Sequence, residues 1–174
     1  MLLLTSKQNL FISEGLRLFA TIFILFILHI PLFYKILLII LTDSFDCGLP
    51  NLFFQDWIDC NTNLYQFLDK TVDLISYIIL FSHVVYTKHL EKDKNLILGF
   101  LLFYRTIGEI CFFVFENRLF LLFFPNFFLE TLLVFVGMKY FKISNVYLPC
   151  FMFIMILWKF FQEYYIHIHK NPSL

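Results

Sequence analysis

Residues 101–113 read LLFYRTIGEICFF, and this stretch decides how the rest of the chain is interpreted. An arginine and a glutamate, Arg105 and Glu109, stand four residues apart inside an otherwise apolar run. A lone charge at the centre of a membrane helix costs about 2.5 to 3.5 kcal/mol, so its presence requires compensation. On a helix, side chains four residues apart share a face and can pair. The stretch therefore predicts a membrane helix whose two charges neutralise each other or belong to a site.

Composition places the whole chain in a membrane. Its 174 residues are 60% hydrophobic and 15% charged, and the mean hydropathy is +0.80. A soluble domain carries about 25% charged residues. The sequence therefore predicts an all-α integral membrane protein whose first partner is the lipid bilayer, and the neutral net charge without a basic patch argues against nucleic acid. The 26 phenylalanines beside a single alanine indicate a GC-poor genome, so we expect the cell (inner) membrane of such an organism.

Five apolar segments are each close to the length of about 20 residues that a spanning helix needs. They predict a single transmembrane domain over residues 1–174 with one long outer loop, residues 42–71. The alternative is four spans, with residues 36–58 lying in the interface. The five predicted spans are residues 16–41, 72–87, 95–115, 119–138 and 143–165.

The basic residues predict an orientation, because short cytoplasmic loops carry an excess of Lys and Arg. If five helices alternate, seven basic residues fall on one side and three on the other. This count favours the N-terminus inside and the C-terminus outside. The seven are Lys7, Arg17, Lys88, Lys92, Lys94, Lys139 and Lys142, and the three are Lys70, Arg118 and Lys170.

The long outer loop contains two cysteines, Cys47 and Cys60. On the oxidising side of the membrane they could form a disulfide worth about 3 kcal/mol, and the alternative is two unpaired thiols. Apolar residues between Leu52 and Ile58 interleave with Gln55, Asp56 and Asp59, and Trp57 would lie at headgroup level. That pattern predicts a short amphipathic helix lying on the membrane surface.

Other polar residues stand at a similar depth in the predicted fourth and fifth spans. The fourth contains FFPNFFLE, in which Pro125 frees a backbone carbonyl from the helix. The sequence predicts that the polar groups line a cavity open to the outer side. In that cavity Arg105 has two candidate partners, Glu109 and Glu130. The alternative is a bundle whose buried charges only fix the register of the helices. The candidate cavity residues are Arg105, Glu109, Asn126, Glu130, Lys159 and Glu163.

A metal site has weaker support. Glu163 and His167 are four residues apart near the end of the last span and could provide two ligands. Glutamate, tyrosine and histidine at a helix end are more often interfacial anchors. The sequence shows no zinc-type spacing of Cys and His. We therefore predict neither a metal nor a cofactor.

Three segments, FYRTIGEICF, LLFFPNFFLE and WKFFQEYYIH, together resemble an uncharacterised family of bacterial multi-pass membrane proteins. The shared patterns are Y-R-x-x-G, F-P-N and Q-E-Y-x-x-H, and the resemblance covers about residues 100–168. It brings no named activity. It implies only that one constellation contains Arg105, Asn126, Glu130, Glu163 and His167.

Three classes of function remain open at this point. The first is a membrane protein that binds a small polar or lipid-like ligand in the outward cavity, or that serves as a subunit of a membrane complex. The second is a small transporter or channel that uses Arg105 and Glu130. The third is an enzyme that acts on a lipid. The lack of a catalytic motif favours a role without catalysis.

Overall fold

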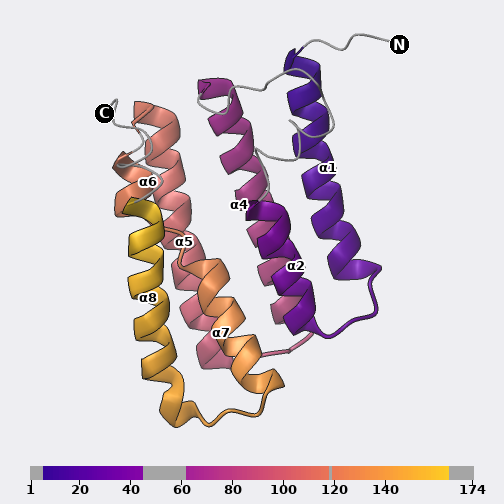
Figure 1. Ribbon diagram of the computed structural model, residues 1–174, viewed down its shortest axis with the longest axis vertical. Helices are drawn as coiled ribbons and strands as arrows, with labels where there is room; N and C mark the ends of the chain where they lie inside the picture. Colours follow the sequence, from indigo (N-terminus) through magenta and orange to yellow (C-terminus); the bar gives the residue numbers. More distant parts are fainter. Residues whose placement is uncertain (1–5, 45–61, 118, 165–174) are drawn as a thin grey trace. The chain divides into compact units, whose positions relative to one another are not determined.

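The computed structural model describes residues 6–44, 62–117 and 119–164, and every element in these ranges is helical. This confirms the all-α class for the described part of the chain (Figure 1). The chain divides into two compact units, Met1–Leu80 and Phe81–Leu174. The elements are α1 (Ser6–Phe26), α2 (Leu32–Ser44), α4 (Asn63–Tyr86), α5 (Lys92–Phe115), α6 (Leu119–Phe123), α7 (Phe128–Tyr140), the 3₁₀ helix η1 (Asn145–Tyr147) and α8 (Leu148–Tyr164).

Four helical segments among the described residues are long and apolar enough to cross a bilayer. They contain between 18 and 24 residues. At a rise of 1.5 Å per residue this corresponds to about 27 to 36 Å, which matches a hydrocarbon core of about 30 Å. The four are Gln8–Phe26, Lys92–Phe115, Leu119–Tyr140 and Asn145–Gln162.

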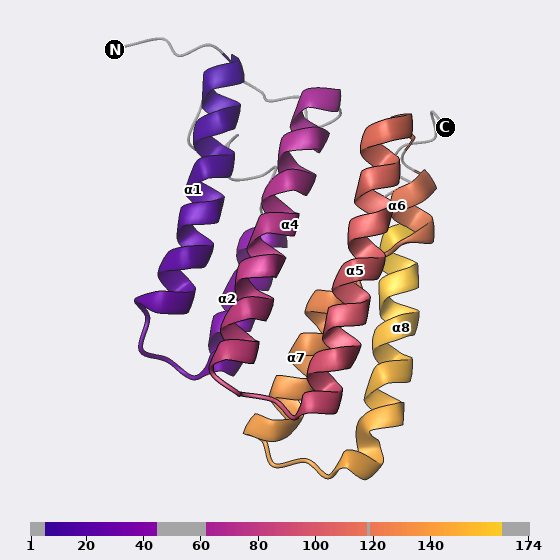
Figure 2. The same cartoon turned by 180° about the vertical axis from the view of Figure 1, so that it is seen from behind.

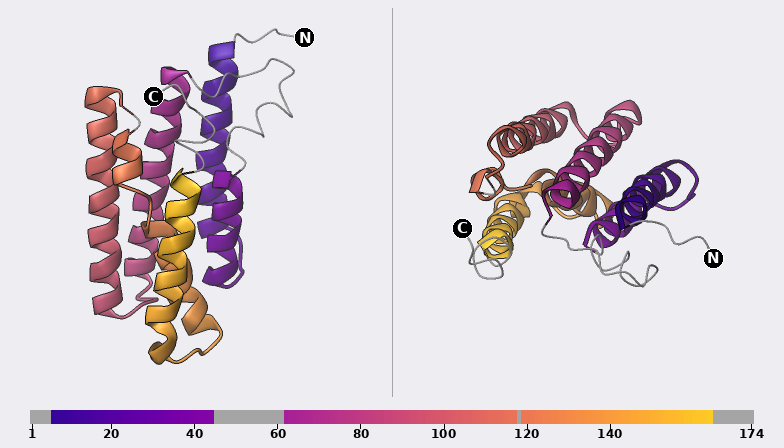
Figure 3. Two further views of the ribbon diagram at one scale, coloured as in Figure 1. Left: turned by 60° about the vertical axis from the view of Figure 1, so that its left-hand side comes forward. Right: turned by 90° about the horizontal axis from the view of Figure 1, so that it is seen from above.

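The first predicted span is two helices rather than one. Instead of continuing through residues 16–41, the chain leaves α1 after Phe26 and turns back as α2 (Figure 3). Pro31 explains the break, because proline has no backbone N–H to donate and disfavours the helical conformation in the residue before it. Lys35 then donates from Nζ to the Leu25 carbonyl at 2.6 Å. This bond satisfies an acceptor at the end of α1, so the lysine holds the hairpin together.

In the second unit, α5 packs against α6 and α7, and α7 packs against α8 (Figure 2). The fourth predicted span is interrupted where residues 124–127 leave the helix, between α6 and α7. Pro125 lies in this interruption and cannot donate to the helix ladder. The freed carbonyls of this break need donors from a neighbouring element, because a buried backbone carbonyl without a hydrogen-bond partner is costly.

Gly108 allows α5 to approach the break closely. A Cβ atom added at Gly108 would lie 2.2 Å from Cβ of Phe124. That distance is far below van der Waals contact, so only glycine fits at this crossing. By contrast, Gly15 in α1 faces open space, with no atom within 4 Å of an added Cβ.

We expect Gly108→Ala to destabilise the protein by about 1 to 3 kcal/mol, because the added methyl group overpacks the crossing of α5 with the break. Gly15→Ala is the matched control and should be neutral or stabilising by up to about 1 kcal/mol, because alanine favours helix. The free energy of unfolding in detergent micelles measures both. Equal stability of the two variants would show that α5 does not approach Phe124 as closely as described.

The predicted disulfide between Cys47 and Cys60 and the predicted amphipathic helix between them lie outside the described residues. The same is true of His167 and of the side chain of Glu163. These predictions stay predictions.

Candidate functional site

Arg105 and Glu109 meet at the break between α6 and α7. The guanidinium of Arg105 donates from Nε to Oε1 of Glu109 at 2.9 Å. It also donates from Nη1 to the carbonyl of Phe124 at 2.9 Å. Next to it, the Tyr104 hydroxyl donates to the carbonyl of Phe123. Two consecutive residues of α5 therefore satisfy two consecutive carbonyls at the break.

Burial shows why these contacts matter. Arg105 is 4% exposed and Glu109 is fully buried. In such surroundings an unsatisfied carbonyl or an uncompensated charge is expensive. The arginine compensates both at once, because its several N–H groups reach the carboxylate and the carbonyl together. The pair therefore ties α5 to the break.

The second predicted acid, Glu130, pairs elsewhere. Its Oε1 lies 2.8 Å from Nζ of Lys159, which joins α7 to α8. Lys159 is 6% exposed and also donates to Oε1 of Gln162 at 3.3 Å. Asn126 is buried in the break, and its Oδ1 has no hydrogen-bond partner among the described residues. Of the two acids considered for Arg105, the structure therefore pairs it with Glu109.

The predicted cavity residues thus form two ion pairs. Arg105 joins Glu109, and Glu130 joins Lys159. An outward-facing cavity that would unite the two pairs stays a prediction.

The sequence analysis missed a larger polar network in the first unit. Its centre is Arg17 of α1, whose Nη1 lies 2.7 Å from Oδ1 of Asp69 and whose Nη2 lies 2.8 Å from Oδ1 of Asp73. Nη2 also lies 3.1 Å from Oε2 of Glu14 and donates to the Asp69 backbone carbonyl at 2.9 Å. All four side chains are buried, with Arg17 the most exposed at 8%.

Two further residues, Lys70 and Asp43, extend this network. Lys70 lies 2.6 Å from Oδ2 of Asp69 and 3.2 Å from Oδ2 of Asp73. Asp43, at the end of α2, accepts a hydrogen bond from the Tyr77 hydroxyl at 3.5 Å. Carboxylates from α1 and α4 therefore contact one guanidinium, and the Asp43 carboxylate of α2 lies beside Asp73. We call the network of Glu14, Arg17, Asp43, Asp69, Lys70, Asp73 and Tyr77 the carboxylate network.

The carboxylates of the network differ in their affinity for a proton. Burial and the neighbouring Asp73 carboxylate raise the pKa of Asp43 well above its usual range. Burial also acts to raise the pKa of Asp69, but the charges of Lys70 and Arg17 outweigh it and hold that pKa at about 2. Asp69 is therefore a permanent anion near neutral pH, while Asp43 keeps its proton where an ordinary aspartate has lost it.

The spacing of these residues contains a signal that could have found the network. Glu14 and Arg17 are three residues apart, and Asp69 and Asp73 are four apart, so each pair shares a helix face. The prediction of a single first span placed Arg17 and Lys70 on opposite sides of the membrane. In the structure both contact Asp69. The count of seven basic residues against three therefore loses its basis.

Compared with known protein families, with curated proteins and with solved structures, the chain shows no match. The function must therefore be argued from its own residues.

We expect Arg105→Met to destabilise the protein by about 3 to 5 kcal/mol, because it removes the cation paired with the buried Glu109. The double variant Arg105→Met/Glu109→Met removes both charges and should recover much of this loss. A deficit of about 1 to 3 kcal/mol should remain, because the Phe124 carbonyl has lost its donor. Unfolding in detergent micelles measures all three proteins. A double variant no more stable than the single one would contradict the pairing.

Proposed function

We propose that this chain is a multi-pass membrane protein without catalytic activity whose carboxylate network binds and releases a proton, as a small transporter or channel requires. One observation carries the proposal: three acids, Glu14, Asp69 and Asp73, contact Arg17, and a fourth acid, Asp43 from α2, lies beside Asp73. Ionisable groups inside membrane proteins are costly, and they mark ion and proton pathways.

The Asp43 carboxyl is the group that would carry the proton. It contacts neither Arg17 nor Lys70 directly. Its carboxylate accepts a hydrogen bond from the Tyr77 hydroxyl, and the acid beside it is Asp73. Two carboxyl groups that share a site cannot both ionise easily, so one of them retains a proton. Asp73 itself contacts both cations, Arg17 and Lys70. A change at Asp73 would then change the affinity of Asp43 for its proton.

Enzymatic action on a lipid has no comparable support. The described residues contain no group of three or more His, Cys, Asp or Glu side chains that could hold a metal ion. Among the same residues, the acids of the carboxylate network are engaged with Arg17 and Lys70 or with each other. The transporter class is therefore the better proposal.

We expect Asp43→Asn to weaken the dependence of stability on pH. The folded state raises the pKa of Asp43 above its unfolded value of 3.8, so this group stabilises the fold fully below that value. The stabilisation is lost as the pH rises through the folded pKa, because the ionised carboxylate is buried beside Asp73. The unfolding temperature of the wild type should fall over that range, and that of Asp43→Asn should fall less. Asp93→Asn, at an exposed position of α5, is the control.

Proton flux tests the functional part of the same proposal. In liposomes with an imposed membrane potential, the wild type and Asp93→Asn should take up protons faster than protein-free liposomes, and Asp43→Asn should not. If the wild type gives no flux while the pH dependence of its stability follows Asp43, the network binds a proton without moving it. If neither effect is seen, the network only holds the helices together and the proposal fails.

The orientation also needs a new proposal. The carboxylate network lies near the start of α4, and Lys88 follows the end of this 24-residue helix. A helix of that length rises about 36 Å, enough to separate its ends across a bilayer. Five lysines lie in or next to the two short connections from α4 to α5 and from α7 to η1: Lys88, Lys92, Lys94, Lys139 and Lys142. The positive-inside rule then places these lysines in the cytoplasm and the carboxylate network outside.

This proposal agrees with the sequence prediction on residues 42–71 and on the five lysines, and it differs only in the N-terminus, which the hairpin of α1 and α2 brings to the outer side. A single cysteine introduced at Gln8, in a variant without the native cysteines, should react with an impermeant maleimide in intact cells. A cysteine at Lys88 should react only after the membrane is opened. If the cysteine at Gln8 also reacts only after the membrane is opened, the predicted orientation with the N-terminus inside is restored.

A further inference from the structure

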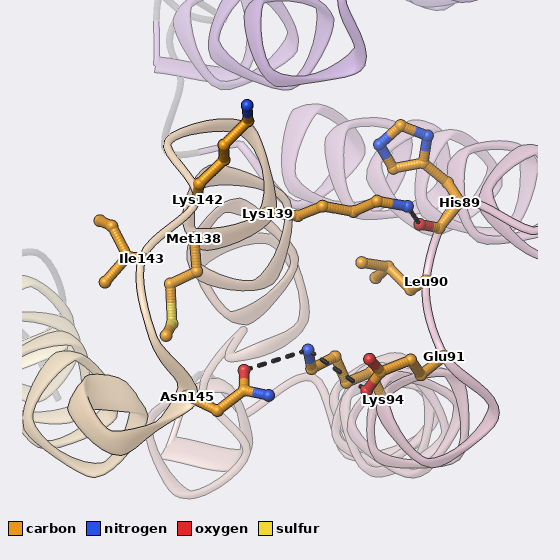
Figure 4. Close-up of a pocket in the computed structure, with 9 residues that line it drawn as sticks. All are labelled: His89, Leu90, Glu91, Lys94, Met138, Lys139, Lys142, Ile143 and Asn145. Carbon is orange, nitrogen blue, oxygen red and sulfur yellow. Dashed lines mark hydrogen bonds and ion pairs between the residues drawn. The ribbon is translucent and has the colours of Figure 1, made fainter.

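A cavity of about 300 Å³ lies at the end of the second unit where α5 begins and α7 ends (Figure 4). Its wall combines the turn between α4 and α5 with the connection from α7 to η1. Three lysines line it, Lys94 from α5 and Lys139 and Lys142 from the end of α7, together with His89 and Asn145. Neither the ion pairs of the break nor the carboxylate network contribute to it.

The positive charge of this cavity exceeds its negative charge. Glu91 is the only acid in the wall. Its carboxylate lies 3.5 Å from Nζ of Lys94, but its side chain is 73% exposed, so solvent screens the pair. Lys142 is exposed and has no ion-pair partner among the described residues. Three cations close together without an equal number of anions repel each other, and an anionic ligand would relieve this repulsion.

The donors of the cavity come from different walls. Nζ of Lys94 lies 3.4 Å from Oδ1 of Asn145, while Lys139 reaches across to donate to the His89 carbonyl (Figure 4). Glu91 precedes α5 and places no side-chain cap on its first turn. The positive end of the α5 dipole lies at this end of the cavity and favours an anion, although Asp93 in the first turn offsets part of it.

The electrostatic environment of His89 agrees with this picture. Burial, followed by the positive charges of Lys139 and His83, lowers the pKa of His89. The imidazole is thus kept neutral in a positive field, and a bound anion would act to reverse that shift. His89 therefore offers a probe of ligand binding inside the cavity.

The cavity lies at headgroup depth if the candidate spans cross the bilayer. Three of them have an end at its wall: one begins at Lys92, one ends at Tyr140 and one begins at Asn145. Exposed aromatic side chains, Tyr140, Phe141 and Tyr147, surround the same level. Aromatic residues are enriched at the boundary between hydrocarbon and headgroups.

We propose that this cavity binds the phosphate of an anionic phospholipid headgroup through Lys94 and Lys142. Lysine-rich pockets between membrane helices suit such headgroups, because they add charge attraction to a fixed position at the interface. The volume is at the lower limit of ligand pockets, about 300 Å³, and suits a headgroup rather than a whole lipid. Free inorganic phosphate carries the same anionic group, so the experiment must distinguish a phospholipid headgroup from soluble phosphate.

The test compares the binding of phosphatidylglycerol and phosphatidylcholine to the purified protein by native mass spectrometry. The wild type should prefer the anionic lipid, and the double variant Lys94→Gln/Lys142→Gln should bind it about 25-fold more weakly, since each lysine near an anionic surface contributes about a factor of five. The matched control is Lys88→Gln/Lys92→Gln, which should keep the preference. Like Lys142, Lys88 has a left-handed backbone, and like Lys94, Lys92 is in the first turn of α5.

Inorganic phosphate provides the second arm. The imidazole resonances of His89, followed by NMR as the pH is varied, should show a higher pKa with phosphatidylglycerol than without it, while millimolar phosphate should shift it little. A full shift with phosphate and no lipid preference would replace the lipid by a soluble phosphate ligand and overturn the proposal. Equal losses in both double variants would also overturn it, because general surface charge would then explain the binding.

Discussion

The second unit depends on the backbone carbonyls left without helix partners where residues 124–127 interrupt the helix between α6 and α7. A buried carbonyl without a donor is costly, so such a break is stable only where another helix supplies one. Tyr104 and Arg105 supply two donors from adjacent positions of α5. Glu109 then balances the charge that the arginine brings. The proline, the arginine and the glutamate are therefore parts of one arrangement.

Gly108 belongs to the same arrangement for a steric reason. A guanidinium can reach a backbone carbonyl only if the two helices come close, and α5 has no side chain where Phe124 crosses it. The rest of the chain is rich in phenylalanine and poor in small residues. One glycine at the crossing is therefore enough to permit contact, and the large side chains around it fill the remaining space.

The ion pairs of the second unit and the carboxylate network of the first differ in their ratio of acids to cations. We assign a structural role to the former and the proposed function to the latter for this reason. Arg105 and Glu109 meet one to one, and so do Glu130 and Lys159. In the carboxylate network several acids share Arg17 and Lys70, and Asp43 has an acid as its neighbour. Balanced pairs hold helices in register, whereas an acid beside another acid is poised to exchange a proton.

The sequence by itself determined the helical class, the apolar segments and the pairing of Arg105 with a nearby acid, because hydropathy and spacing along one helix are local properties. It also predicted that Pro125 frees a backbone carbonyl, but not that the helix is interrupted there. Only the tertiary structure decided that Pro31 turns the chain back, that Arg17 meets Asp69, and that Glu130 takes Lys159 instead of Arg105. These contacts join residues distant in the chain, and the partner of a charge is chosen by which helices pack together.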